Sequence, residues 1–262
     1  MEYEDILFEK TGAVARLTIN RPRSYNAFTS RTLGELTDAY ERIGEDSQVG
    51  VVVLTGAGDK AFCAGGDVHW EAQGSLQGRR AEEEMKRLYA AMRASLKPTI
   101  GRVNGYAIGG GNHLAYFCDF TVAAEHAIFG QNGPRVASPA QGWIVSYLVR
   151  VVGAKRAREM WMLCRRYSAK RALEWGLVNA VVPYSELDAE VQRWCDELLA
   201  LSPTVIKVLK KSFDEEYGQL REIQDSRDFL AEINPAFFAS GEQQEGANAF
   251  IEKRQPDFLR WR

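Results

Sequence analysis

The sequence has few residues of the kinds that bind metals or form disulfides. It contains four cysteines and three histidines among 262 residues. The cysteines are widely spaced, and no Cys/His cluster has the spacing of zinc ligands, so we expect no metal site. Three of the cysteines have apolar neighbours in the sequence. We therefore predict reduced core cysteines in a cytoplasmic protein.

The chain also lacks a strong net charge and a long apolar segment. Its formal net charge is −2, which gives no sign of a nucleic-acid-binding surface. No apolar run approaches the ~20 residues that cross a bilayer, and the acidic N-terminus has no signal-peptide pattern. We expect no nucleic-acid partner, no membrane partner, and one large domain or a core with a small appendage.

A run of three glycines is the most informative feature that is present. Residues 99–103 are short, apolar and β-branched, as in a buried strand. Gly109, Gly110 and Gly111 then allow a sharp turn, and residues 112–118 have helical spacing. A helix that begins at such a turn directs unpaired N–H groups and the positive end of its dipole into the space before it, which suits a developing oxyanion. Close packing of a helix on a sheet would explain the same three glycines.

A second glycine turn makes the pattern specific. Ala-Phe-Cys-Ala-Gly-Gly-Asp (residues 61–67) follows the apolar run 51–54, so two turns can each offer one N–H to the same oxygen. Together with Asn-Gly-Tyr-Ala-Ile-Gly-Gly-Gly (residues 104–111), it resembles the crotonase (enoyl-CoA hydratase/isomerase) superfamily, over nearly the whole chain. The resemblance implies that the N–H groups of Gly66 and Gly110 form an oxyanion hole for an acyl-CoA thioester.

The order of the expected elements favours an α/β fold. A hairpin over residues 6–19, an amphipathic helix over 33–43 and a strand over 49–55 give a βαβ order, which is typical of a parallel sheet with right-handed crossovers. From residue 144 onward the chain is predicted to be mostly helical. The resemblance implies a crotonase-like spiral of ββα turns with a C-terminal helical region.

The resemblance also divides the chain into two parts. It implies a spiral core that binds acyl-CoA over residues 1–200 and a helical trimerisation region over 201–262. The C-terminal helices should pack across a neighbouring subunit, in a homotrimer or a dimer of trimers. Phe229, Leu230 and Phe237 support this in part, because little local sequence is available to cover them.

Two polar segments are expected near the ligand. Residues 20–27 form a polar loop, which the resemblance places beside the CoA nucleotide with Arg23 near a phosphate; a solvated loop arginine is the alternative. Residues 68–80 are predicted to be a long loop, which in this superfamily is a lid, with Trp70 as an acyl contact.

The resemblance assigns CoA contacts to Arg23, Ala27, Ala64 and Asp67. Coenzyme A would be part of the substrate, with no tightly bound cofactor.

The acid–base residues typical of the superfamily are absent. Hydratases of this kind use two glutamates, whose positions are occupied here by His113 and Gly133. Phe-Gly-Gln-Asn-Gly-Pro-Arg-Val-Ala-Ser (residues 129–138) instead resembles the 1,4-dihydroxy-2-naphthoyl-CoA synthases and the 2-ketocyclohexanecarboxyl-CoA hydrolases. In that branch Ser138 supplies an active-site hydroxyl.

The chain departs from this branch as well. Ala140 stands where the branch has an aspartate and Phe238 where it has a tyrosine, so two proton-transfer groups of the usual ring closure are missing. His113 is then either a hydrogen-bonded core histidine or the base, since an unperturbed imidazole pKa of ~6.5 suits proton transfer near neutrality.

Bicarbonate is the other candidate for the missing base. Some synthases with glycine at the position of Gly133 hold bicarbonate there. The groups that would hold it match Gln131, Asn132, the Gly133 backbone and Trp161. An aspartate introduced at position 133 would then replace the anion in part.

We therefore expect an acyl-CoA enzyme that works through a thioester enolate. The favoured reaction is hydrolytic C–C cleavage, or ring opening, of a cyclic or branched β-keto acyl-CoA. The alternatives are an enoyl-CoA hydratase or isomerase with a non-standard base, and ring closure of the synthase type. Because several acid–base positions are lost, a non-catalytic binder of CoA thioesters is a further alternative.

Overall fold

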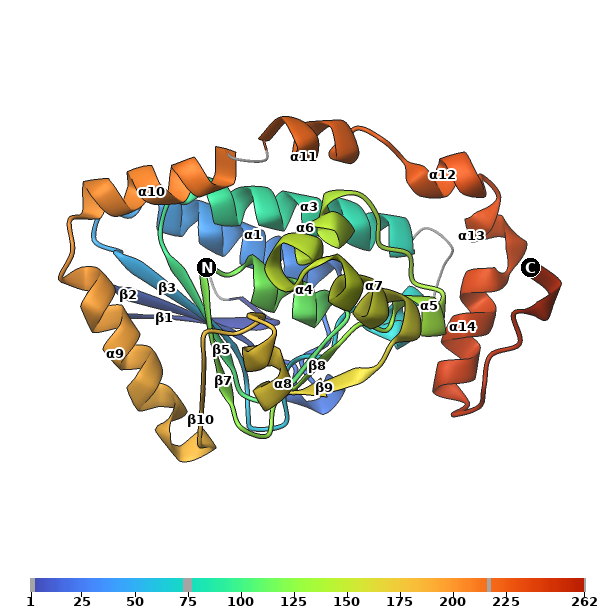
Figure 1. Cartoon of the computed structure of the whole chain (residues 1–262), viewed down its shortest axis with the longest axis horizontal. Coiled ribbons are helices and arrows are strands. Elements are labelled where there is room, and N and C mark those ends of the chain that lie inside the picture. The colour runs from blue at the N-terminus through green and yellow to red at the C-terminus, as the bar shows by residue number, and fades with distance from the viewer. Residues whose placement is uncertain (1–2, 73–76, 216–217, 262) are drawn as a thin grey trace.

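The computed structural model describes residues 3–72, 77–215 and 218–261. Its larger sheet has the strand order β1-β2-β3-β5-β7-β10 (Figure 1). The β1–β2 pair is an antiparallel hairpin and the other pairs are parallel, as predicted. The strands are β1 (Ile6–Thr11), β2 (Val14–Ile19), β3 (Val51–Gly56), β5 (Thr99–Val103), β7 (Phe120–Ala124) and β10 (Ala180–Val182).

A smaller sheet has the order β4-β6-β8-β9, in which β9 is antiparallel to β8 and the other pairs are parallel. The chain passes three times from the larger sheet into the smaller one, as β3–β4, β5–β6 and β7–β8, and a helix follows each time. This repeat confirms the expected spiral of ββα turns. The strands are β4 (Ala61–Cys63), β6 (Tyr106–Ile108), β8 (Ile128–Gly130) and β9 (Arg166–Ser168).

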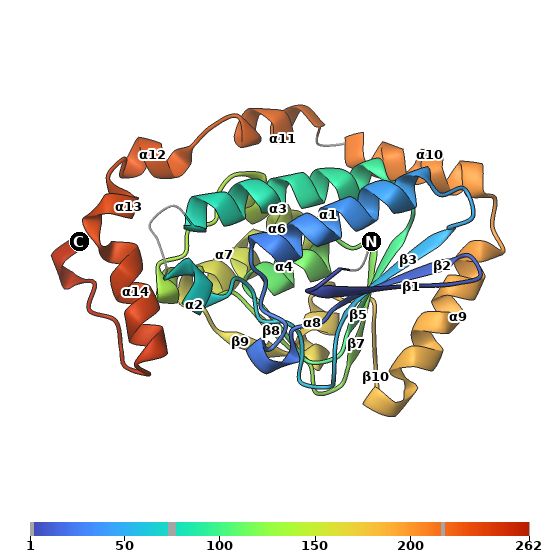
Figure 2. The ribbon, with the colours of Figure 1, turned by 180° about the vertical axis from the view of Figure 1, so that it is seen from behind.

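The larger sheet is covered on both faces. Val52 and Leu54 of β3 join the main core, which includes residues of α1, whereas Val51 and Val53 join a second cluster with α9. A strand with both faces buried reads as a continuous apolar run, which is why the sequence shows β3 so clearly. Helices α1 and α3 lie side by side (Figure 2).

The helices of the body occupy most of the chain between the strands. They are α1 (Ser30–Glu45), α2 (Val68–Glu71), α3 (Gln77–Ala94), α4 (Gly110–Phe117), α5 (Gly133–Val136), α6 (Trp143–Val152), α7 (Ala154–Leu163), α8 (Ala169–Glu174) and α9 (Leu187–Leu199), with short 3-10 helices at Pro22–Ser24, Tyr184–Glu186 and Leu259–Trp261.

Residues 68–80 were predicted to form one long loop, but much of this segment is helical. It begins with α2 and ends within α3, and residues 73–76 lie outside the described residues. The Asp67 side chain accepts hydrogen bonds from the N–H groups of His69 and Trp70, so it caps α2. The prediction was wrong here because a four-residue helix is too short to show hydrophobic periodicity.

The C-terminal helices form an arm around the body (Figures 1 and 2). They are α10 (Pro203–Glu215), α11 (Gly218–Asp225), α12 (Phe229–Ile233), α13 (Phe237–Ser240) and α14 (Glu242–Ile251). At the far end α14 packs against α2 and α5, and a Cβ on Gly246 would overlap the backbone of Val136. The sequence predicts that these helices cover a neighbouring subunit, but α14 covers its own chain.

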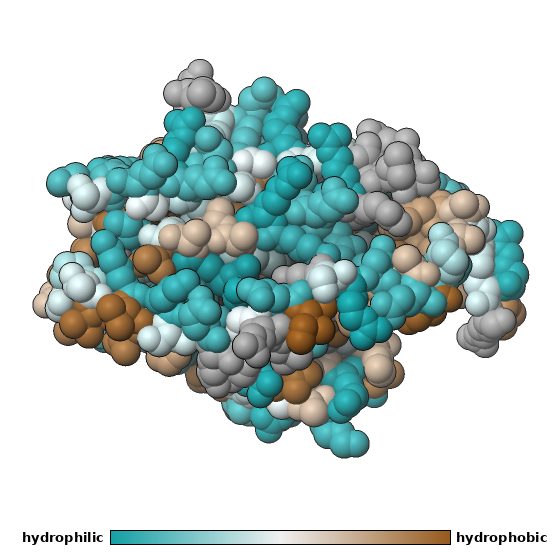
Figure 3. Space-filling model, turned by 90° about the horizontal axis from the view of Figure 1, so that it is seen from above, coloured by the Kyte–Doolittle hydropathy of each residue, from teal (hydrophilic) through white to brown (hydrophobic). Residues whose placement is uncertain are grey.

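The face that carries the arm is largely hydrophilic, with separate apolar areas (Figure 3). Within the described ranges, no helix has the length and apolar character needed to cross a membrane. No three His, Cys, Asp or Glu side chains in those ranges gather as metal ligands do. All four cysteines are buried and unpaired, as predicted for reduced core residues.

Candidate active site

Three parallel strands of the smaller sheet end at the same edge. Because β4, β6 and β8 pair in parallel, the residues that follow them lie near one another. Residues 64–67 follow β4, residues 109–113 follow β6, and residues 131–133 follow β8. The carboxyl ends of parallel strands are a common place for ligand sites. Sheet order therefore brings together motifs that are far apart in the sequence.

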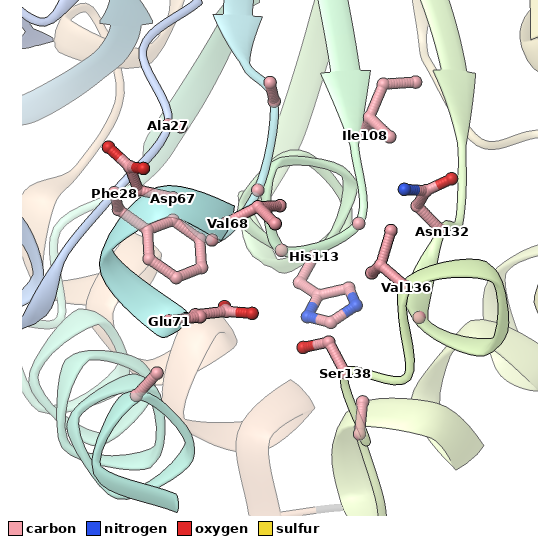
Figure 4. Close-up of a pocket in the computed structure, with 18 of the residues that line it drawn as sticks. Ala27, Phe28, Asp67, Val68, Glu71, Ile108, His113, Asn132, Val136 and Ser138 are labelled. Atoms are coloured by element: carbon pink, nitrogen blue, oxygen red, sulfur yellow. The ribbon is translucent and has the colours of Figure 1, made fainter. Parts of the chain in front are cut away.

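A cavity of about 540 Å³ opens at this edge (Figure 4). Trp70, the expected acyl contact, is not one of its lining residues, whereas Phe250 of α14 is. The other residues that the sequence assigns to catalysis or binding do line it: Gly66, Gly110, His113, Ser138, Arg23, Ala27, Ala64, Asp67, Gln131, Asn132, Gly133 and Trp161.

The two glycine turns contact each other at the cavity wall. Gly65 has φ +97°, which favours glycine, and a Cβ on it would lie 2.9 Å from the Ile108 oxygen and 3.2 Å from the Gly110 nitrogen. In the part of the chain that the structure describes, the N–H groups of Gly66 and Gly110 have no hydrogen-bond acceptor. Two unpaired backbone donors therefore lie on adjacent turns beside the cavity.

Asp67 has an ion-pair partner as well as its capping role. Its carboxylate lies 2.9 Å from Nη2 of Arg21 and is almost fully buried. Arg21 in turn lies 3.6 Å from Asp5, near the N-terminus. Asp67, one of the predicted CoA contacts, thus lines the cavity while fixing the start of α2.

Glu71 is a cavity residue that the sequence analysis missed. It points into the cavity from α2, toward Ser138 (Figure 4). Its Oε1 atom occupies the space that a Cβ on Gly66 would need. Burial raises the pKa of Glu71 to about 7, the Ser138 side chain acts to lower it, and the charge of Asp67 raises it. A carboxyl group with this pKa can exchange protons near neutrality.

The sequence contained one usable signal for Glu71. A glutamate four residues after a helix-capping aspartate lies one turn into the helix, close above the cap. That spacing becomes informative only when Asp67 is recognised as a cap and not as the start of a long loop.

His113 is buried on α4 between two aromatic rings. Its ring centroid lies 5.2 Å from that of Trp161 and 5.6 Å from that of Tyr116. The His113 Nε2 atom is 3.2 Å from Oε1 of Gln131, so Nε2–H donates to this amide oxygen. Burial lowers the pKa of His113 to about 4, which leaves the imidazole neutral at pH 7. The sequence analysis considered His113 as a base because an imidazole usually has a pKa of ~6.5. That premise was wrong, since the pKa of His113 is lowered.

Two buried donors beside His113 lack acceptors within the described residues. They are Nε2 of Gln131 and Nε1 of Trp161. Asn132 differs, because its Oδ1 accepts a hydrogen bond from Nη2 of Arg166 at 3.2 Å. A buried polar group without a partner costs ~1–3 kcal/mol, so an oxygen atom of a ligand or small anion would be stabilised here.

Gly133 leaves no room for a side chain. A Cβ on it would lie 2.6 Å from the backbone oxygen of Ser138, and backbone moves less readily than a flexible side chain. The expectation that an aspartate at this position could replace a bound anion was therefore wrong.

Aromatic and cationic side chains mark one side of the cavity opening. Tyr25 and Tyr106 are each about half exposed, and their ring centroids are 6.2 Å apart in an edge-to-face arrangement. Arg23, on the adjoining short helix, is exposed and also lines the cavity. Aromatic faces suit a nucleotide base and a guanidinium group suits phosphate, which are the groups that a CoA nucleotide presents.

Comparisons with known proteins extend over the whole fold. The profile of a family described as enoyl-CoA hydratase/isomerase matches residues 9–260. An enoyl-CoA hydratase structure from Mycobacterium avium subsp. paratuberculosis K-10 is 28% identical, with a TM-score of 0.86, covering 98% of this chain and 100% of that one. An enoyl-CoA hydratase/isomerase structure from Xanthobacter autotrophicus Py2 is 30% identical, with a TM-score of 0.81, and the match covers 98% of this chain and 100% of that one. An enoyl-CoA hydratase structure from Bacillus anthracis is 30% identical, with a TM-score of 0.78, and the match covers 97% of this chain and 99% of that one.

Proposed function

Because the chain belongs to the enoyl-CoA hydratase/isomerase family, we propose that it binds an acyl-CoA thioester and stabilises the enolate between the amides of Gly66 and Gly110. The observation that carries the proposal is a pair of N–H groups, on adjacent turns of the cavity wall, that have no acceptor among the described residues. Such fixed donors stabilise the negative oxygen of an enolate more than the neutral carbonyl of the substrate, which lowers the barrier.

The reaction that we propose is addition of water to an enoyl thioester or a proton shift within one. Each passes through a thioester enolate, and the similar structures carry hydratase and isomerase names. Ring-opening hydrolysis, which residues 129–138 favour, would use this enolate too and stays a prediction. Ser138 lines the cavity in a position to contact any of these substrates.

We also propose a role for the unpaired donors of Gln131 and Trp161. They would hold one oxygen of the substrate or of a small anion such as bicarbonate, which would supply a proton acceptor when bound. The neutral His113 would orient Gln131 through the hydrogen bond from Nε2–H.

A panel of substrates tests the proposal. Purified protein would be incubated with trans-2-hexenoyl-CoA, trans-3-hexenoyl-CoA and 2-ketocyclohexanecarboxyl-CoA, with products identified by mass spectrometry. Turnover of the first two supports hydratase or isomerase activity, and turnover of the third supports ring opening. The same rates in degassed buffer with and without bicarbonate test the anion. Failure to bind or convert any of the three thioesters would refute the proposed function.

A further inference from the structure

We infer that Glu71 is the catalytic proton-transfer group of this site and that Ser138 positions its carboxylate; the inference rests on the proposed acyl-CoA chemistry. Sequence motifs do not point to Glu71, because the glutamates of typical hydratases fall at two other positions, His113 and Gly133. The assignment comes instead from where α2 places this side chain.

Partners distinguish Glu71 from the other acidic side chains of the cavity. Asp67, Glu71 and Glu82 are the acidic residues that line it within the described ranges. Asp67 is paired with Arg21 at 2.9 Å and caps α2, and Glu82 is paired with Lys86 at 3.0 Å. Glu71 has no cationic partner in those ranges. It is therefore the acidic group whose protonation state is least fixed by a neighbour.

The carboxylate of Glu71 lies beside one of the two candidate oxyanion donors. Its Oε1 atom fills the space next to the Cα of Gly66, and Ser138 faces it across the cavity (Figure 4). A thioester whose oxygen accepts from the Gly66 N–H has its C2 carbon one bond away from the carbonyl carbon. That carbon would therefore lie close to the carboxylate, which is the positioning that proton transfer requires.

The proton transfer can be written as a balanced step. The Glu71 carboxylate takes a proton from C2, the electrons of that C–H bond form the C1–C2 double bond, and the carbonyl electrons move to oxygen as the enolate. Glu71, now a neutral carboxylic acid, returns the proton to C2, or to C4 when the chain carries a 3,4 double bond. One carboxyl group thus suffices for a proton shift between two carbons.

His113 does not compete for this role at neutral pH. It is buried and neutral, with Nε2–H donated to Gln131, and burial lowers its pKa to about 4. A base of that pKa accepts a carbon-bound proton much less readily than a carboxylate with a pKa near 7.

Hydrogen–deuterium exchange at C2 tests the inference directly. Wild type, Glu71→Gln and the control Glu83→Gln, an exposed residue of α3 outside the cavity lining, would be incubated with butyryl-CoA in D₂O. Deuterium incorporation would be followed by mass spectrometry, and binding of butyryl-CoA by calorimetry. We expect Glu71→Gln to exchange ~10²–10⁴-fold more slowly with little change in Kd, and Glu83→Gln to match wild type.

Each other outcome has a distinct meaning. Unchanged exchange in Glu71→Gln overturns the role of Glu71 and leaves the oxyanion hole intact. Parallel loss of binding and exchange overturns the catalytic role in favour of a binding role. A wild type that neither binds nor exchanges butyryl-CoA refutes the acyl-CoA proposal and this inference together.

The pH profile of exchange decides the question if Glu71→Gln does not fold. Because the carboxylate is the active form, the wild-type rate should rise with pH through about 7, and Ser138→Ala should move the midpoint upward, since Ser138 lowers the pKa of Glu71. A flat wild-type profile, or an unmoved midpoint in Ser138→Ala, would overturn it. The titratable and charged groups beside Glu71 include His69 on α2, Asp67 with Arg21, Glu82 with Lys86 on α3, and Glu242 and Glu245 on α14. Arg254 pairs with Glu245 and with Glu252, which follows α14, and His113 on α4 is neutral.

Discussion

At the scale of single residues, Glu71 should lower the stability of the protein. Its pKa is raised from 4.5 to about 7 in the folded chain, so the folded state holds this proton over a pH range in which the unfolded state has lost it. Stability from this group is therefore present below pH 4.5 and falls as the pH rises from 4.5 to 7.

We predict that Glu71→Gln raises the free energy of unfolding more at pH 8 than at pH 5. The raised pKa corresponds to a gain of up to about 3 kcal/mol at pH 8, because glutamine removes the buried charge. Urea denaturation of both proteins at the two pH values measures this. An equal gain at both pH values would contradict the titration of Glu71 in this range.

His113 gives a second prediction at this scale. Since burial lowers its pKa to about 4, the Cε1 proton of His113 should keep one NMR chemical shift between pH 5.5 and 8. The signal can be assigned by its absence in His113→Gln, which retains a polar group beside Gln131. A titration midpoint near 6.5 would restore the imidazole as a candidate base.

At the scale of elements, the start of α4 combines a donor with a close contact. Gly110 is the first residue of the helix, and a Cβ on it would lie 2.5 Å from the ring of Phe28. Substitution here therefore disturbs packing as well as the N–H group, and a single variant does not separate the two effects.

We predict that Gly110→Pro is far less active than Gly110→Ala. Both variants place a Cβ against Phe28, and proline is tolerated at the first position of a helix, but only proline removes the N–H. Loss of an oxyanion donor should slow exchange by a further ~10²–10³-fold. Circular dichroism and the C2 exchange rate measure folding and activity. Equal rates in the two variants would remove Gly110 from the oxyanion hole.

At the scale of the whole molecule, the C-terminal arm has two kinds of surface. On its inner side, α14 supplies Phe250 to the cavity and packs against α2, which carries Glu71. Elsewhere on the arm, Val208, Phe213 and Ile233 are 58%, 71% and 83% exposed. Large apolar side chains exposed to this degree are typical of surfaces that other chains cover.

We predict that the arm mediates assembly into a homotrimer or a dimer of trimers. Phe213→Glu should lower the molar mass measured by light scattering at micromolar concentration, because a buried charge without a partner destabilises an interface. Gln192→Ala, on the exposed face of α9, serves as the control. A wild-type monomer under these conditions would contradict the prediction.

The sequence by itself determined the parallel sheet, the two glycine turns and many of the residues that line the cavity, although it missed Glu71 and misplaced Trp70. Strands β3 (Val51–Gly56) and β5 (Thr99–Val103) are buried on both faces, and the turns at Gly65 and Gly109 have positive φ, so local composition encodes both features. Residues that follow parallel strands must then meet at one edge.

Tertiary structure alone decided which side chain has a pKa suited to proton transfer. The pKa values of His113 and Glu71 move in opposite directions from their usual values, because burial disfavours a cation on one and an anion on the other. Burial depends on distant segments, such as Gln131, just after β8, beside His113 and the loop with Ser138 beside Glu71. The short elements β9 and α2 were also missed, since three or four residues are too few for periodicity to appear.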